Sequence, residues 1–329
     1  MRKLILAIGA LGLVASVAVV APLGTVAAGV PAGPPAPGSI NCDGGFHTVA
    51  SPNGLGANFL TSTSVLSATD IWAVGDATSG TGFDKTLAEH WDGASWTIVP
   101  TPTVGAFDND LNGVAAVSAS DVWAVGDYAT NSSATALVAT ALHWNGSGWT
   151  SYAFGYSSFT TLLAVTAVSS NDVWAVGTYT NPGNLTLIEH WNGSAWSKVP
   201  SVDPGTLDNQ LFAVSAWNST DVWAVGHQQS NIANSPVQSL AEHWNGSAWS
   251  AITTPNTALG DNEIFGVTAL EAGHAVGVGY GNYVANTLTP KRSEGWDLRA
   301  GEGAPQASGT AHRGDGDGSG GAGLQCALR

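Results

Sequence analysis

Six residues recur four times in this chain, about fifty residues apart. The segment reads Asp-Val-Trp-Ala-Val-Gly at 121–126, 172–177 and 221–226, and Asp-Ile-Trp-Ala-Val-Gly at 70–75. A degenerate fifth copy occupies 273–280, so the glycines that end the copies follow one another at intervals of 51, 51, 49 and 53 residues. A catalytic site needs one copy of its chemistry. The repetition therefore indicates architecture, a chain built from similar units.

Each copy sits in the same series of short segments. A run rich in Ala, Ser and Val comes first, then the six residues, then a polar loop, then a strand that ends in His-Trp and a turn of Asn-Gly or Asp-Gly before a last Trp-bearing strand. Short β-branched and aromatic runs between turn residues read as strands, and Asn-Gly is a strong hairpin signal. The sequence predicts an all-β fold, a β-propeller of four-stranded antiparallel blades.

We expect five blades. The fifth unit lacks a convincing fourth strand, and the segment Phe-His-Thr-Val-Ala-Ser-Pro-Asn at 46–53 matches the fourth-strand pattern of the other units. A ring that borrows its last strand from the N-terminus removes its open sheet edge. We therefore predict that 46–53 pairs in the last blade, beside residues near 264–289.

The repeats also resemble a known family. An apolar run ending in Gly, a variable loop, an aromatic-bearing strand and a Trp on the last strand are similar to the kelch repeat, which also builds the central domain of galactose-oxidase-like proteins. The resemblance covers roughly 46–289. It departs at two points: the kelch Gly-Gly is a single Gly, and His-Trp replaces the usual Tyr. The resemblance implies a propeller with a propensity for binding.

The N-terminal segment 1–28 has the features of a secretory signal peptide. Arg2 and Lys3 precede an apolar run that ends near Val20, and small residues suited to cleavage follow. An uncleaved anchor is the alternative, because the run is nearly long enough to span a bilayer. We expect a secreted, extracellular, bacterial protein with no membrane contact beyond this segment.

The repeated region is flanked by two segments of other composition. Residues 29–45 read as a Pro/Gly-rich linker, and residues 290–329 as a low-complexity, disordered tail. A shifted reading frame or a truncation that has removed further blades is the other explanation of the tail. Cys42 and Cys326 lie in these flanks, where they either pair in a disulfide or remain free thiols.

Acidic side chains dominate the repeated region. Between residues 43 and 289, nineteen Asp and Glu stand against only Lys85 and Lys198, a net charge of −17. A body this acidic repels phosphate backbones, so nucleic acid is excluded as a partner.

Four histidines recur at one position of the repeat, opposite the Asp that begins the six-residue segment. Each lies in a different blade, so they cannot converge on one metal ion. We expect buried structural hydrogen bonds instead, similar to the Asp/His tie of WD-repeat propellers. The expected pairs are Asp70–His90, Asp121–His143, Asp172–His190 and Asp221–His243.

One rim of the predicted propeller is free to vary. The turns between the first two and the last two strands keep their length, whereas the loops on the opposite rim differ in length and content. Rigid strands that present variable polar loops form a binding face. The side chains expected on that face are Asp108, Asn109, Tyr128, Tyr179, Asp208, Asn209, Asp261 and Asn262.

The favoured function is a non-catalytic, monomeric propeller that binds a protein or a cell-surface polysaccharide at this rim. The alternative is a carbohydrate-active enzyme, a hydrolase or lyase, that uses rim carboxylates; two carboxyls about 5–10 Å apart would favour it. A structural spacer is a third interpretation. No cofactor is expected, unless Asp108, Asp208 and Asp261 surround one opening and bind Ca²⁺ rather than each capping its own turn.

Overall fold

The structure is a computed structural model. It describes residues 48–54, 56–156, 159–180, 183–230, 235–256, 260–281 and 292–300. All regular secondary structure in these ranges is β, and no helix there has the length and hydropathy to cross a membrane. Cys42, Cys326 and the expected signal peptide lie outside the described residues.

The strands group into five successive blades. Blade 1 comprises β1 (Asn58–Ser67), β2 (Asp70–Thr78), β3 (Asp84–Trp91) and β4 (Trp96–Ile98). Blade 2 comprises β5 (Asn109–Ser118), β6 (Asp121–Ala129), β7 (Leu137–Trp144) and β8 (Trp149–Ala153). Blade 3 comprises β9 (Thr160–Ser169), β10 (Asp172–Thr180), β11 (Asn184–Trp191) and β12 (Trp196–Lys198). Blade 4 comprises β13 (Asp208–Asn218), β14 (Asp221–Gln229), β15 (Gln238–Trp244) and β16 (Trp249–Ile252). Blade 5 comprises β17 (Asn262–Glu271), β18 (His274–Gly281) and β19 (Arg292–Arg299).

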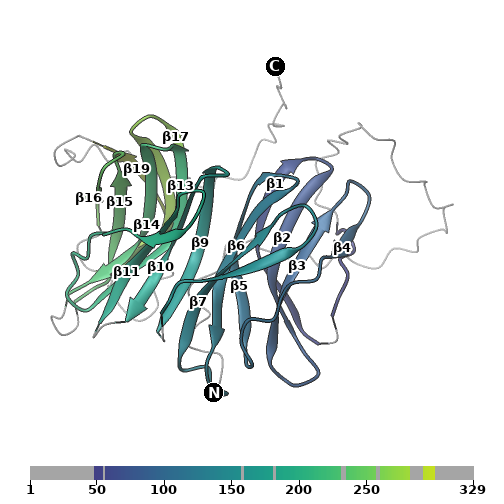
Figure 1. Cartoon of the computed structure of the whole chain (residues 1–329). Coiled ribbons are helices and arrows are strands. Elements are labelled where there is room, and N and C mark those ends of the chain that lie inside the picture. The colour runs from purple at the N-terminus through teal and green to yellow at the C-terminus, as the bar shows by residue number, and fades with distance from the viewer. Residues whose placement is uncertain are drawn as a thin grey trace, which may run out of the picture.

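Within each blade, consecutive strands pair antiparallel in chain order. Blades 3 and 4 are also joined by one parallel pairing, between Asn184 of β11 and Asp208 of β13. The blades follow one another across the molecule from the purple and blue β1–β4 to the green β13–β17 (Figure 1). The predicted all-β propeller of four-stranded antiparallel blades is confirmed; the fifth blade shows three strands in its described part.

The glycine that ends each repeated segment is required by a bulge in the neighbouring first strand. In blade 2 the register shifts between Leu111 and Gly113, which brings the carbonyl oxygen of Asp110 against Gly126. A Cβ atom on Gly126 would lie 1.9 Å from that oxygen. The equivalent glycines 75, 177, 226 and 279 show the same approach, at 1.9–2.0 Å. No larger residue fits there.

The core lies between blades, not within them. Four buried apolar clusters fill the junctions 1–2, 2–3, 3–4 and 4–5. In each, a buried Val or Trp of the repeated strand of one blade packs with the Leu or Ile of the first strand of the next. A repeated Trp, such as Trp123 against Trp191 and Trp196, fills the outer part of the junction. Apolar burial between repeats is what holds such a chain together.

The expected Asp–His hydrogen bonds are present in all four blades that carry the motif. The distance between His Nε2 and Asp Oδ1 is 2.8–2.9 Å in each pair. The imidazole also stacks on the buried Trp of the repeated strand, as His190 does on Trp174, with ring centroids 4.1 Å apart. Asp172 further accepts a hydrogen bond from Nε1 of Trp174. The pairs thus tie the second strand to the third and hold the core Trp in place.

The prediction that the N-terminal segment closes the last blade is wrong for the residues described. Residues 48–53 belong to no strand. They lie instead on blade 1, where Ser51 Oγ donates a hydrogen bond of 2.5 Å to Glu89 of β3. Gly54 N also donates to Asn58 Oδ1. The bond between Glu89 and Ser51 is equivalent to those by which Glu189 and Glu242 hold the segments that precede blades 3 and 4.

The expected boundary of the tail also needs correction. Residues 292–299, assigned to the tail, form β19 and pair with β18 along its whole length. Trp296 is buried against blade 4, and its Nε1 donates to the carbonyl of Pro255. The third strand of blade 5 lacks the Glu-His-Trp motif, but it keeps the polar tie with the partners exchanged, because His274 Nε2 lies 2.7 Å from Asp297 Oδ1. Trp296 and Leu298 add buried apolar contacts.

We predict that His190→Ala destabilises the fold, because it leaves the largely buried Asp172 carboxylate without one of its partners. The expected loss in the free energy of unfolding is about 1–3 kcal/mol. Urea unfolding measures it, with Ser197→Ala as the control, since Ser197 faces solvent in the same register pair. Equal stability of His190→Ala and wild type would contradict a structural role.

Candidate functional site

One rim of the molecule is built from the same bonds in four blades. The Trp that ends each third strand donates through Nε1 to a carbonyl of the turn between the first two strands, at 3.1–3.2 Å. The glycines 93, 146, 193 and 246 of the last hairpin all have φ between 90° and 95°. The polar groups of these turns make the same hydrogen bonds in all four blades. This rim therefore serves the fold, as the turn geometry requires.

The opposite rim carries the loops that differ between blades, and it collects different side chains at each junction. The Asp-Asn pairs before the first strands were expected to face a ligand there. Asn109 and Asn209 are instead buried, and each holds its own connection by accepting from a glycine N (Gly105 or Gly205) at 2.7 Å. Asn262 is buried too and donates to the carbonyl of Gly260. These three amides are part of the fold and offer no binding surface.

The preceding aspartates do not converge on one cation. Asp108 accepts from the backbone N of Asp84 at 3.0 Å, and Asp261 accepts from the backbone N of Val237 at 2.9 Å. Asp208 lies 3.3 Å from His227 Nε2, and this contact and Gln210 lower its pKa against the effect of burial. Each aspartate therefore ties its own connection to a neighbouring strand, and the described carboxylates that do come together are others.

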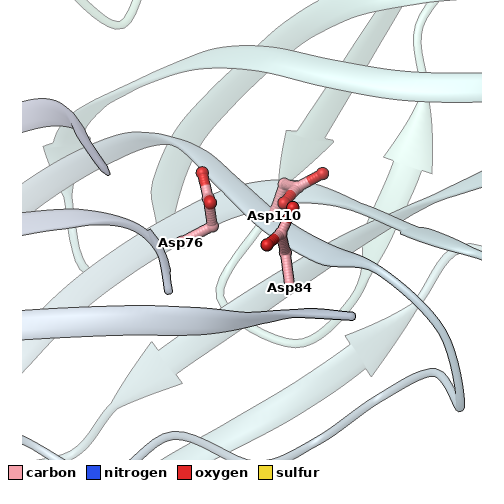
Figure 2. Close-up of side chains that lie close together, drawn as sticks. All are labelled: Asp76, Asp84 and Asp110. Carbon is pink, nitrogen blue, oxygen red and sulfur yellow. The ribbon is translucent and has the colours of Figure 1, made fainter. Parts of the chain in front are cut away.

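Three other carboxylates do meet on this rim (Figure 2). Asp76 lies near the end of β2, Asp84 begins β3, and Asp110 lies in β5 of the next blade. One carboxylate oxygen of each lies within 4.8 Å of the other two. Burial raises the pKa of Asp110 to about 8, and the negative charges of Asp127, Asp76, Asp84 and Asp108 contribute to the same shift. Asp110 is therefore mostly protonated at pH 7, which relieves the repulsion among the three groups.

The sequence pattern does not predict this cluster, because its members come from two blades. A signal was nevertheless present: Asp76 and Asp127 directly follow the repeated Gly, where the other blades have Thr178, His227 and Tyr280. These side chains meet the first strand of the next blade. His227 Nδ1, for example, lies 3.7 Å from Glu263 of blade 5, and the Asp208 and Glu263 carboxylates raise the pKa of His227 to about 9.

The first strands of all five blades surround a central cavity of about 300 Å³. Thr61, Asn112, Leu163, Phe212 and Phe265 line it, one from each blade. The side near blades 4 and 5 is aromatic, with the rings of Phe212 and Phe265 stacked at 5.3 Å. The opposite side is polar. The cavity is a space into which a ligand on the rim can extend.

A second cavity of about 370 Å³ lies on the variable rim of blade 3. Tyr179 forms its base, and the Lys198 ammonium lies 3.4 Å from the centre of the Tyr179 ring. Thr186, Ser201 and Asp203 add hydroxyl and carboxylate oxygens. Both rim tyrosines are half-buried: Tyr179 lines this cavity and packs against the apolar cluster between blades 2 and 3, and Tyr128 lies beside Gly105.

Three buried glutamates clamp the connection that comes from the preceding blade. Glu89 accepts from Ser51, and Glu189 accepts from the Tyr156 hydroxyl at 2.5 Å. Glu242 accepts from the backbone N of Val202 at 3.1 Å. Burial raises the pKa of Glu242 to about 8 despite that hydrogen bond. These groups position the rim but do not reach its surface.

Comparisons with known proteins find only distant likenesses to solved structures. No protein-family model matches it, and no curated protein matches it. Among solved structures, YCF48 bound to D1 peptide superposes with a TM-score of 0.40 at 15% identity, covering 67% of this chain and 60% of that one. A protein of unknown function from Dyadobacter fermentans gives 0.48 at 14% identity, covering 72% and 75%. A fucose-specific lectin from Aleuria aurantia gives 0.38 at 13% identity, covering 73% and 78%. The chain spans three fifths of the YCF48 chain, and these likenesses carry no argument about a ligand.

We predict that the protein loses stability as pH rises from about 5 to about 8, through Glu242. Below pH 4.5 this group is protonated both folded and unfolded. Between its ordinary pKa of 4.5 and its folded value of about 8, only the unfolded chain releases the proton, so the free energy of unfolding falls with pH.

Urea unfolding of wild type and Glu242→Gln at pH 5, 7 and 9 measures this effect. The variant should lose less stability over the range, whereas the control Glu271→Gln, at an exposed site, should follow wild type. Identical pH profiles for all three proteins would show that Glu242 titrates normally.

Proposed function

We propose that the chain is a non-catalytic binding propeller whose ligand, a protein or a cell-surface polysaccharide, binds on the rim of variable loops. One observation carries the proposal: the two rims differ in how their polar groups are used. On the repeated rim, the same hydrogen bonds occupy these polar groups in four blades. On the other rim the side chains differ at every junction, and the cavity of blade 3 lies there.

The cavity on blade 3 is the best supported contact point. An aromatic ring beside hydroxyl, carboxylate and ammonium groups suits a sugar or a polar peptide side chain, because the ring supplies apolar area and the polar groups fix orientation. The Lys198 ammonium lies over the Tyr179 ring and so restricts the ring before a ligand arrives. Preordered aromatic side chains contribute strongly to affinity.

We infer that the repeats are kelch-like, that residues 1–28 direct secretion of a bacterial protein, and that 29–45 and the residues after 300 flank the propeller. N-terminal sequencing of the secreted protein tests the leader. A mature chain that begins near residue 28 or 29 supports it, and a chain that keeps the leader indicates an anchor instead.

The alternative, a carbohydrate-active enzyme, is supported by the cluster of Asp76, Asp84 and Asp110. Neighbouring carboxyls that differ in protonation can act as acid and nucleophile. Their oxygens lie within 4.8 Å of one another, and the pKa of Asp110 is raised to about 8. The three side chains do not line either described cavity, however, and so the binding function is favoured.

We predict that Tyr179→Ala weakens binding to the ligand at least tenfold, about 1.4 kcal/mol. Glycan-array and pull-down screens of the mature protein identify ligands, and titration of each hit measures the affinity. The control Ser170→Arg places a large side chain on the repeated rim and should bind as wild type does. Loss of binding in Ser170→Arg but not in Tyr179→Ala would show that the ligand binds on the repeated rim.

The same preparations test the enzyme alternative. Incubation of the mature protein with each polysaccharide that it binds should release no reducing ends. Hydrolysis that Asp110→Asn abolishes would overturn the non-catalytic assignment.

A further inference from the structure

The two end blades each expose an apolar face that every inner blade buries. Leu60 of β1 is 46% exposed, whereas its equivalents Leu111, Leu162, Leu211 and Ile264 in the other blades are each 0% exposed. Val278 of β18 is 58% exposed, whereas its equivalents Val74, Val125, Val176 and Val225 are each 0% exposed. The equivalence follows from the register, because each Val lies one residue before the bulge-facing Gly of its blade.

These residues are the two halves of one contact that the structure forms four times. The pairs Val74 with Leu111, Val125 with Leu162, Val176 with Leu211 and Val225 with Ile264 share the four buried clusters. In each pair the Val comes from one blade and the Leu or Ile from the blade that follows. No buried cluster in the described part of the chain joins blade 5 to blade 1. Val278 and Leu60 would be the fifth pair.

The same chain does not bring these two faces together in the structure. The four filled junctions set the angle between successive blades, and their central side chains are fully buried. Drawing blade 5 onto blade 1 would require these junctions to repack, and closely packed cores resist such changes. A second copy supplies the missing half without any change in the first.

The charge pattern also suits contact between copies. The repeated region carries a net charge of −17, yet neither β1 (Asn58–Ser67) nor β18 (His274–Gly281) contains an Asp, Glu, Lys or Arg. In an acidic protein, like-charge repulsion opposes self-association wherever charged faces meet. The strands that carry Leu60 and Val278 thus add no charge to the contact. On the neighbouring β19, the exposed Asp297 is paired with His274 and Arg299.

We propose that blade 5 of one copy packs on blade 1 of a second copy, with Val278 against the partner's Leu60. The contact is head-to-tail, and each copy carries both halves of it. Two copies form a closed dimer where the rotation between them lets the contact be made twice. The occupant of both end faces is a second copy of this chain, in place of the monomer expected from the sequence.

Sedimentation velocity over a range of concentrations tests the proposal on the full mature chain. Wild type should sediment as a dimer at high concentration, and Val278→Asp as a monomer with an unchanged melting temperature. Leu270→Asp is the matched control. Leu270 is 46% exposed, and its equivalent in blade 4, Trp217, is 51% exposed although blade 5 packs beside it. This position therefore stays exposed when a following blade is present. This control should stay dimeric. A monomeric wild type, or a Val278→Asp protein that stays dimeric, would overturn the proposal.

Disulfide trapping separates contact between copies from closure within one. In chains with Cys42→Ser and Cys326→Ser, oxidation of a mixture of Leu60→Cys and Val278→Cys proteins should yield crosslinked dimers. The variant that carries both new cysteines should likewise give crosslinked dimers or larger species. A crosslinked monomer of the double variant would show that the chain closes on itself, and absence of any crosslink would exclude the contact.

Discussion

Each inner blade is stabilised by burying both of its faces against its neighbours, and the rest of the structure depends on this packing. A single four-stranded sheet with two apolar faces cannot shield them from water, so a blade is stable only in a stack. The repeated residues serve this contact directly. Val and Trp fill it, Gly allows the bulge of the neighbouring strand to approach, and the Asp–His pair holds the Trp in its rotamer.

This packing decides where a ligand can bind. Because both faces of the inner sheets are covered, a ligand can reach these blades at the two rims and the central cavity but not on a sheet face. The repeated rim is occupied by its own turns. In four blades a Trp side chain is bonded to the equivalent carbonyl, and an Asn, or Asp92 in blade 1, accepts from the backbone of the last hairpin. The variable rim keeps the features that differ, including the acidic cluster of blades 1 and 2, the aromatic side of the central cavity and the Tyr179 cavity. Differences confined to one rim are what a binding face requires.

Much of the fold could be predicted from the sequence, because repetition makes a local pattern a statement about the whole chain. The strands, their order and the Asp–His partners follow from the spacing of one motif. The errors occur where the pattern ends. Residues 48–53 resemble a fourth strand but lie on blade 1, since the Glu89 carboxylate binds Ser51 just as Glu242 binds the connection before it. The strand at 292–299 lacks the motif and is held by Trp296 and by an exchanged His274–Asp297 pair.

The rim was harder to predict, because a linear pattern does not report which residues of different blades meet. The Asp-Asn pairs looked like surface residues, yet Asn109 and Asn209 are buried caps of their own connections. Asp76 and Asp110 are 34 positions apart, and only the junction of two blades brings them together. The sequence could identify the variable rim but not the groups that gather on it.

Hydrogen exchange in a variant of one junction tests the central claim most directly. Leu211→Ala removes side-chain volume between blades 3 and 4, where Leu211 packs in one cluster with Val176. If each blade is stabilised by the next, exchange should accelerate on both sides of the junction, in β10 of blade 3 and β14 of blade 4, and much less in β6 of blade 2. Acceleration confined to blade 4, with β10 unchanged, would contradict the account.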